Sequence, residues 1–379
     1  MTVAREIDRN VEICGRPVLK TCYCDERQRR KNEKLCPEKK MKKVAPADEA
    51  QQTQTSVLCR ALEQHVRQGD ILRQLGVVFK VFLGGAAKRD KVISHKTKEI
   101  REQTIVQAYR QLKQDGFAIK DIRNIKPKHI NHLIGVWQKN NLSVATMHSR
   151  LSILRVFCEW LGKSGMIPPA AKLLPEHQAK RSYVAEKDKS WTAHEIDPEQ
   201  LIRQIQQFDL YVAMQLEVIQ AFGLRRKEAI CFKPWQVETP EGDAIRIYSG
   251  TKGGRPRMIP IDTPQKRAVI EAAKAFVPHK QAHIADPDKT LKQNIARFGY
   301  VMLRFGITKE ASGATAHGLR HQYANDRFEE FTGNTTPVRG GDGRVDEAIN
   351  EARYRVSEEL GHSRIKITNS YYGKFQRQG

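Results

Sequence analysis

The chain has 379 residues, of which 39% are hydrophobic and 29% charged; this excludes an intrinsically disordered protein and predicts more than one folded domain. Its 66 Lys and Arg against 43 Asp and Glu give a formal net charge of +23, so nucleic acid is the first partner to expect. No apolar run reaches the roughly 18 residues of a membrane-spanning helix, and no apolar segment follows Met1, so we expect a cytoplasmic protein without a membrane partner.

Residues 1–85 form a basic N-terminal region that is predicted to begin as a flexible arm, with much of its positive charge between Arg27 and Lys43. Between Thr55 and Leu83, apolar residues recur at helical spacing and predict one or two amphipathic helices. Seven cysteines in the chain do not suit a disulfide framework. Four cysteines lie close together in this region and either form a zinc site or are unrelated thiols: Cys14, Cys22, Cys24 and Cys36. Their spacing lacks the paired C-x2-4-C motifs of common structural zinc sites.

Residues 86–167 are predicted to form a small all-helical domain. Its apolar pattern indicates four helical stretches, separated by Gly116, by the turn at 124–127 and by the pair at 140–141. Ser143 is the expected N-cap of the last helix, which has one apolar face and one face carrying arginines. The first face would pack, and the second is suited to phosphate.

Residues 168–190 are predicted to be an interdomain linker, because they combine prolines and lysines without periodicity. Helical patterns dominate residues 191–379, with one interruption. Two β-type runs, at 244–248 and 257–261, flank a glycine-rich turn and predict a β-hairpin with a lysine at its tip. Residues 332–344, rich in Gly, Thr and Pro, predict a loop.

Four motifs in the second half carry residues suited to phosphate chemistry. They are Gly223-Leu224-Arg225 with Glu228, Lys252 in the hairpin turn, His317-Gly318-Leu319-Arg320-His321, and Leu360-Gly361-His362 nine residues before Tyr371. Arginine forks neutralise charge on phosphate oxygens and stay protonated. A tyrosine hydroxyl needs a base or a positive pocket to become a nucleophile. Each motif alone has an ordinary alternative, such as a surface ion pair between Arg225 and Glu228.

Taken together, the order and spacing of these motifs resemble the tyrosine recombinase (phage integrase) family, and in particular the integrases of mobile genetic elements. The resemblance implies that Tyr371 attacks DNA and forms a 3′-phosphotyrosine intermediate without a metal or any other cofactor. It implies five further site residues. Arg225 and Arg320 would be two phosphate clamps, and His317 the proton acceptor. His362 would be a second donor to the phosphate, and Lys252 the general acid.

Three neighbouring side chains compete with or support these roles. Tyr372 is adjacent to the expected nucleophile, but the nine-residue step from His362 selects Tyr371. Tyr354 is a weaker alternative because it precedes the Gly-His pair. His321 is expected to support its helix.

The resemblance also implies a fold and partners. The fold class is mainly α with a small β-hairpin, with a SAM-like core-binding domain at 86–167 and a recombinase catalytic domain at 191–379 that form a C-shaped DNA clamp. Residues 1–85 would be an arm-type DNA-binding segment or a solvated tail. The implied partners are double-stranded DNA attachment sites, further copies of the chain in a tetramer on two sites, and accessory DNA-bending or directionality factors, all at the nucleoid.

Two features depart from the family pattern. The stretch from Arg320 to His362 is long because of the 332–344 loop, and only seven residues follow Tyr372 to contact a neighbouring protomer. The loop either replaces that contact or is a surface excursion. Strand relaxation like that of a type IB topoisomerase, and a non-catalytic DNA-binding regulator on the same fold, are the alternatives to recombination.

Overall fold

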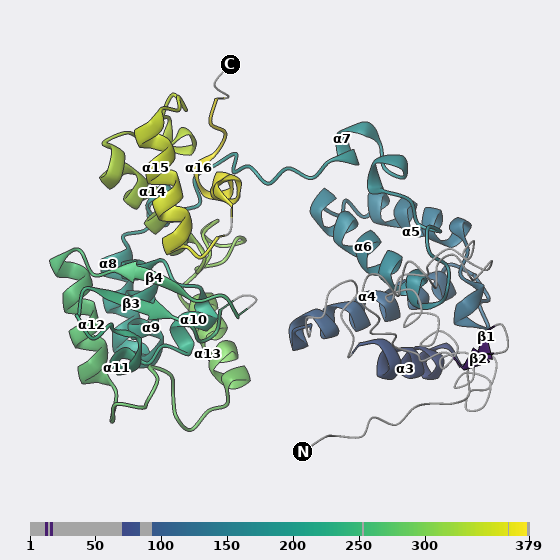
Figure 1. Ribbon diagram of the computed structural model, residues 1–379, viewed down its shortest axis with the longest axis horizontal. Helices are drawn as coiled ribbons and strands as arrows, with labels where there is room; N and C mark the ends of the chain where they lie inside the picture. Colours follow the sequence, from purple (N-terminus) through teal and green to yellow (C-terminus); the bar gives the residue numbers. More distant parts are fainter. Residues whose placement is uncertain are drawn as a thin grey trace. The chain divides into compact units, whose positions relative to one another are not determined.

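The computed structural model describes residues 12–13, 16–17, 70–83, 93–251, 254–362 and 364–376. The chain divides into two compact units, Met1–Arg181 and Ser182–Gly379, and their described residues are mainly helical (Figure 1). Strands β1 (Glu12–Ile13) and β2 (Arg16–Pro17) pair antiparallel near the N-terminus. Among the described residues, no helix is both long enough and apolar enough to cross a membrane. The zinc alternative at the four N-terminal cysteines lies outside the described residues.

The first unit is a helical bundle whose helices begin at polar caps. Ser94 accepts a hydrogen bond from the Thr97 N–H, and Ser143 does the same for Thr146. The inward faces form one core that contains Leu75, Leu112, Leu133, Leu154 and Phe157. The elements are α3 (Ile71–Phe82), α4 (His95–Gln114), η1 (Ile122–Asn124), α5 (Pro127–Lys139), α6 (Val144–Trp160), η2 (Ala170–Lys172) and α7 (Glu176–Ala179).

One prediction for this unit needs correction, and another is confirmed in part. The second of the four predicted helical stretches is only the 3-10 turn η1, which begins at the N-cap Asp121 and ends at Ile125, where the backbone becomes extended. The amphipathic helix predicted before residue 83 is confirmed as α3, and its earlier part lies outside the described residues.

The segment predicted as a linker is packed at both ends. Leu174 is buried in the first core, and the Gln178 carbonyl bonds the His148 ring at 2.8 Å. At the other end, the Ala185 N–H donates to the Asn369 carbonyl at 2.9 Å, within the second unit. The division between the units falls between Arg181 and Ser182.

The second unit is built around α9. This helix is apolar on nearly all sides, as expected for a helix in contact with α8, α10, α12 and α14. Its elements up to α13 are η3 (Thr192–His194), α8 (Pro198–Phe208), α9 (Leu210–Phe222), α10 (Arg226–Ile230), α11 (Pro234–Val237), β3 (Ala244–Ile247), β4 (Arg257–Pro260), α12 (Pro264–Phe276) and α13 (Leu291–Arg304). The predicted hairpin is confirmed, with β3 and β4 antiparallel.

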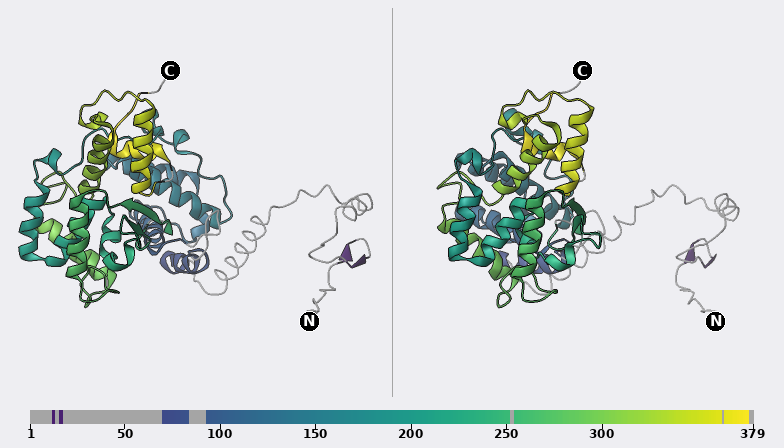
Figure 2. Two further views of the ribbon diagram at one scale, coloured as in Figure 1. Left: turned by 60° about the vertical axis from the view of Figure 1, so that its left-hand side comes forward. Right: turned by 90° about the vertical axis from the view of Figure 1, so that its left-hand side faces the viewer.

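The remaining helices of this unit lie side by side (Figures 1 and 2). They are α14 (Gly318–Thr332), η5 (Pro337–Arg339), α15 (Glu347–Glu359), η6 (Ile365–Thr368) and α16 (Asn369–Tyr372). A separate apolar cluster of Phe328, Val356, Leu360, Tyr372 and Phe375 joins them. The short α16 thus packs on the long α14.

The 332–344 segment is packed and is not a surface excursion. Thr336 is fully buried and bonds Asn325 at 2.6 Å. The Arg339 guanidinium pairs with Asp188, Asp326 and Glu329 at 2.7–3.1 Å. These contacts hold η5 against α14, and η5 in turn contacts α16.

Candidate active site

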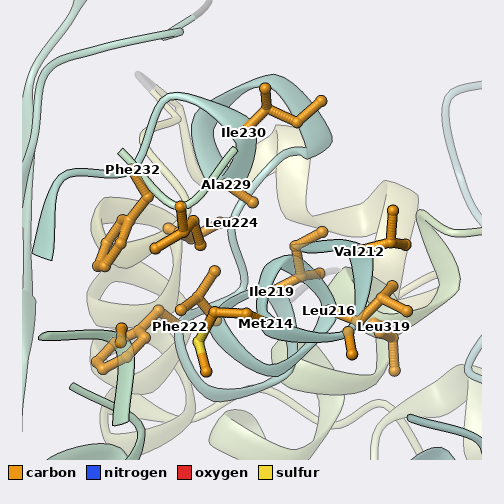
Figure 3. Close-up of a cluster of buried hydrophobic side chains, with 14 of the residues drawn as sticks. Val212, Met214, Leu216, Ile219, Phe222, Leu224, Ala229, Ile230, Phe232 and Leu319 are labelled. Carbon is orange, nitrogen blue, oxygen red and sulfur yellow. The ribbon is translucent and has the colours of Figure 1, made fainter. Parts of the chain in front are cut away.

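Arg225 is placed by the sharp turn between α9 and α10. Gly223 ends α9 with a φ of 57°, and a Cβ at this position would lie 2.3 Å from the Tyr323 ring. Leu224 is buried among Phe222, Ile230 and other side chains of the core (Figure 3). Arg225 follows at the N-cap of α10, with its side chain 24% exposed. The anchored turn therefore leaves this guanidinium partly open to solvent.

Glu228 holds Arg225 in place through two hydrogen bonds. Its Oε1 accepts from Arg225 Nη1 at 2.8 Å, and its Oε2 accepts from the Arg225 backbone N–H at 2.8 Å. The predicted alternative of a surface pair is wrong, because the Glu228 side chain is fully buried and also pairs with Arg257. Burial raises the pKa of Glu228, but hydrogen bonds and charge from Arg257, with the charge of Arg225, outweigh it and lower the pKa to about 2.

Arg320, on the first turn of α14, is fully buried beside Arg225. Its guanidinium donates to the Gly223 carbonyl, to the Leu360 carbonyl at 2.5 Å and, through Nε, to the Tyr371 hydroxyl at 3.1 Å. Desolvation lowers the pKa of Arg320 to about 10, which still leaves it charged at neutral pH. Arg225 Nη2 shares the Leu360 carbonyl at 3.2 Å, so both arginines meet at one backbone oxygen.

Three histidine rings surround Tyr371. Ring centroids lie 6.2 Å away for His317, 4.6 Å for His321 and 5.6 Å for His362, the last in a stacked arrangement. His317 precedes α14 and is partly exposed to solvent, beside a cavity of about 390 Å³ lined also by Arg226 and Phe298. Nδ1 is buried without a hydrogen-bond partner in both His321 and His362.

The histidines are neutral at physiological pH. Desolvation, with the charges of Arg320 and Arg225, lowers the pKa of His317 to about 4 and that of His362 to about 3. Desolvation and neighbouring His317 lower the pKa of His321 to about 3. Neutral imidazoles beside two arginines can accept a proton, and an anion arriving in the site would favour their charged form.

The structure separates the two adjacent tyrosines. The Tyr371 hydroxyl bonds Arg320, whereas Tyr372 is fully buried against Phe328 and Phe375 and its hydroxyl has no hydrogen-bond partner. Desolvation raises the pKa of Tyr372 well above its usual value. Tyr354 is exposed on α15, where it donates to Glu358. Only Tyr371 of these three shares the cluster of arginines and histidines.

The described site therefore unites five of the six residues singled out from the sequence: Arg225, His317, Arg320, His362 and Tyr371. The sixth, Lys252, lies outside the described residues, in the sequence between β3 and β4. His321, expected only to support its helix, is the imidazole nearest to the Tyr371 ring.

Arg257 is a site neighbour that the sequence analysis missed. It lies on β4 opposite Ile247, and its side chain faces inward with that of Ile259. The alternation of β4 contains the signal, because Arg257 and Ile259 share one face and Ile259 is a core residue. An arginine in a buried register position requires buried acceptors, which here are Glu228 and the Glu359 carbonyl.

Comparisons with known proteins match both units. The family model described as "Integrase" matches residues 185–326, and the one described as "Phage integrase, N-terminal" matches residues 84–167. The first match ends before His362 and Tyr371. "Tyrosine recombinase XerC" of Xanthomonas axonopodis pv. citri is 23% identical over 68% of this chain and 77% of the relative. XerC of Methylobacterium nodulans is 23% identical over 75% and 84%, respectively.

Among solved structures, a lambda integrase tetramer bound to a Holliday junction has a TM-score of 0.54 at 13% identity, covering 89% of this chain and 91% of that one. A lambda integrase dimer bound to a COC′ core site has a TM-score of 0.52 at 16% identity, covering 86% and 88%. These likenesses concern the fold. With the two family matches, they lead to one conclusion: the chain belongs to the tyrosine recombinase (phage integrase) family, enzymes of site-specific recombination that cleave and rejoin DNA.

Proposed function

We propose that the chain integrates and excises a mobile genetic element through a 3′-phosphotyrosine at Tyr371. The observation that supports this most directly is the hydrogen bond from Arg320 Nε to the Tyr371 hydroxyl, within a cluster that also holds Arg225 and the three histidines. The cluster combines a nucleophile, fixed positive charge and neutral bases, which are the three elements that attack on a phosphodiester requires.

In the proposed step, the Tyr371 oxygen forms a bond to the scissile phosphorus, and the bond from phosphorus to the 5′ oxygen breaks. The tyrosine proton passes to His317, whose lowered pKa of about 4 keeps it unprotonated before the reaction. Arg225 and Arg320 neutralise the negative charge that develops on the non-bridging oxygens. His362 donates a further hydrogen bond to the phosphate once the anion has favoured its protonated form.

The leaving 5′ oxygen needs a proton, and the resemblance to the family assigns this to Lys252. An ammonium on the turn of a hairpin is a suitable acid, since it carries three donors on a flexible stem. Attack by the 5′ hydroxyl of another strand on the phosphotyrosine then restores a phosphodiester and frees Tyr371. The bond energy is conserved in the intermediate, so the chemistry balances without a nucleotide or metal.

We assign residues 86–167, together with the helix α3 that packs in the same core, to a core-binding domain, 191–379 to the catalytic domain, and the part of 1–85 before α3 to an arm that contacts DNA. The net charge of +23 supports double-stranded DNA as the partner. The lambda integrase tetramer on a Holliday junction supports a tetramer on two attachment sites for this chain as well. Such a protein would work at the nucleoid, with DNA-bending or directionality factors.

Action on a mobile element, as opposed to chromosome-dimer resolution, is supported by what the chain adds to a compact two-domain recombinase. These additions are the N-terminal region of about 85 residues and the packed 332–344 segment.

The test uses attachment DNA identified by sequencing the fragments that become covalently joined to the wild-type chain in cells. Two duplexes carrying that sequence, one of them labelled, are incubated with the chain, and recombinant strands are measured. We expect strand exchange between them. Relaxation of supercoiled DNA without exchange would favour the topoisomerase alternative, and DNA binding without a covalent adduct would favour the regulator.

A further inference from the structure

Arg257 is a buried cation next to the candidate site, where it bonds Glu228. Its side chain is only 3% exposed. Every nitrogen of its guanidinium has an acceptor: Nη1 and Nη2 bond the two Glu228 oxygens at 2.9 and 2.7 Å, and Nε bonds the Glu359 carbonyl at 2.7 Å. One side chain therefore links α10 to the end of α15.

The first link controls the orientation of Arg225. Each oxygen of Glu228 accepts one bond from Arg257 and one from Arg225, so the carboxylate is held between the two residues. Without Arg257, each oxygen would keep one donor, and both would belong to Arg225. The carboxylate could then rotate, and the partly exposed Arg225 guanidinium would lose its fixed direction.

The second link controls the turn that precedes His362. Gly361 has a φ of 67°, and a Cβ there would lie 2.8 Å from Cδ of Arg257, so the arginine stem packs against this glycine. The bond to the Glu359 carbonyl fixes the same turn from the other side. The turn presents the Leu360 carbonyl to Arg225 and Arg320, and its next residue is His362.

We propose that Arg257 is a positioning residue for phosphate attack, which holds Arg225 and the Leu360–His362 turn in their working geometry. The inference rests on the proposed role of Arg225 as a phosphate clamp. Arg257 acts through Glu228 and the backbone, not on DNA. A lysine cannot replace it, because a single ammonium does not span acceptors on two separate elements.

The test compares two scissile groups, the natural phosphate and a methylphosphonate, in nicked suicide duplexes of the mapped attachment sequence. A methylphosphonate carries no negative charge, so its attack needs much less neutralisation by arginine. For Arg257→Met we expect cleavage of the phosphate to slow by about 100-fold or more, the usual loss when one such stabilising group fails. On the methylphosphonate, the difference from wild type should shrink to less than about tenfold, while duplex affinity changes by only a fewfold.

Arg297→Met is the matched control, because it breaks a comparable pair of ion pairs, to Asp209 and Asp286 at 2.5 Å each, within the same unit. It should cleave both substrates as the wild type does. Arg225→Ala should reproduce the pattern of Arg257→Met, and failure of Arg225→Ala to do so would overturn the clamp itself. Failure of Arg257→Met alone would overturn only this inference.

An Arg257→Met chain that is folded by circular dichroism but equally slow on both substrates, or unimpaired on the phosphate, contradicts the inference. Removing the arginine leaves Glu228 with less compensation, which can prevent folding. If Arg257→Met does not fold, two other variants are tested. Arg257→Lys keeps a cation, and the double variant Glu228→Gln/Arg257→Met removes both charges. Their cleavage rates on the phosphate and on the methylphosphonate are compared in the same way. Selective recovery on the methylphosphonate supports positioning, and equal loss on both substrates rejects it.

Discussion

The Nε of Arg320 donates a 3.1 Å hydrogen bond to the hydroxyl of Tyr371, across 51 residues of sequence. Because Arg320 is fully buried, its three acceptors are fixed within the protein, and Tyr371 is one of them. The proposed nucleophile and one of the two proposed phosphate clamps are thus organised as a pair within one chain. Arg225, the other proposed clamp, shares the Leu360 carbonyl with Arg320.

Replacing Arg320 by lysine should slow formation of the covalent adduct by about 100-fold or more, because one ammonium cannot serve two carbonyls, the tyrosine and the phosphate. Rates of adduct formation on a nicked suicide duplex measure this. Duplex affinity, measured by fluorescence anisotropy, should change little, since the chain has 66 lysines and arginines to attract DNA. An Arg320→Lys chain that forms adduct at the wild-type rate would show that Arg320 has only a structural role.

Acid should destabilise the folded chain in two overlapping windows. The three histidines have folded pKa values of about 3 to 4, below their usual 6.5, so their contribution is present above pH 6.5 and is lost as pH falls towards 4. Glu228, lowered from 4.5 to about 2, contributes on the order of 3 kcal/mol above pH 4.5, which is lost between pH 4.5 and 2.

Urea unfolding at a series of pH values measures these contributions. The free energy of unfolding should fall from pH 7 to pH 4, and His321→Asn, which removes one buried imidazole, should flatten the dependence above pH 4. A free energy of unfolding that stays constant from pH 7 to pH 4 would contradict the assigned pKa directions.

Arg339→Ala should lower the free energy of unfolding by roughly 3 kcal/mol, because it leaves partly buried Asp188 and its neighbours without their cation. Adduct formation should also slow, since η5 contacts the helix of Tyr371. Denaturant melts and suicide-substrate rates measure the two effects. Arg344→Ala is the matched control, because its side chain is 83% exposed and pairs with Asp342 of the same segment. Equal behaviour of both variants would contradict the anchoring role of Arg339.

Duplex affinity should fall steeply with salt, because lysines and arginines displace condensed counterions. Six to ten phosphate contacts would reduce affinity by roughly a thousandfold or more between about 50 and 200 mM salt. Fluorescence anisotropy across this range gives the slope. An affinity that does not depend on salt would contradict a basic DNA-binding surface.

Much of the fold was predictable because local rules determine it. Ser143 caps α6 as expected, and the hairpin follows from two short β-type runs around a glycine-rich turn. The site was predictable only as a set of motifs, since its geometry depends on contacts such as Arg320 to Tyr371. Sequence spacing identified the members, and the structure gives their partners.

What sequence reasoning missed shares one cause, which is dependence on distant partners. From the sequence alone, Arg257 looks like an ordinary basic residue of a strand. One of its acceptors is the Glu359 carbonyl, which lies 102 residues later in the chain. Likewise, the 332–344 segment looks like a loop, yet Arg339 pairs with Asp188, which lies 151 residues earlier. Local propensity carries no information on such pairs, because the acceptors come together only after folding.

The assignment of Tyr371 is the central claim, and one measurement tests it most directly. Wild type, Tyr371→Phe and Tyr372→Phe are incubated with the nicked suicide duplex, and covalent protein–DNA adduct is resolved by denaturing gel electrophoresis. Tyr371→Phe should form none. Tyr372→Phe should form adduct as the wild type does, because the Tyr372 hydroxyl that it removes is buried and has no hydrogen-bond partner. Adduct in Tyr371→Phe, with none in Tyr372→Phe, would contradict the assignment.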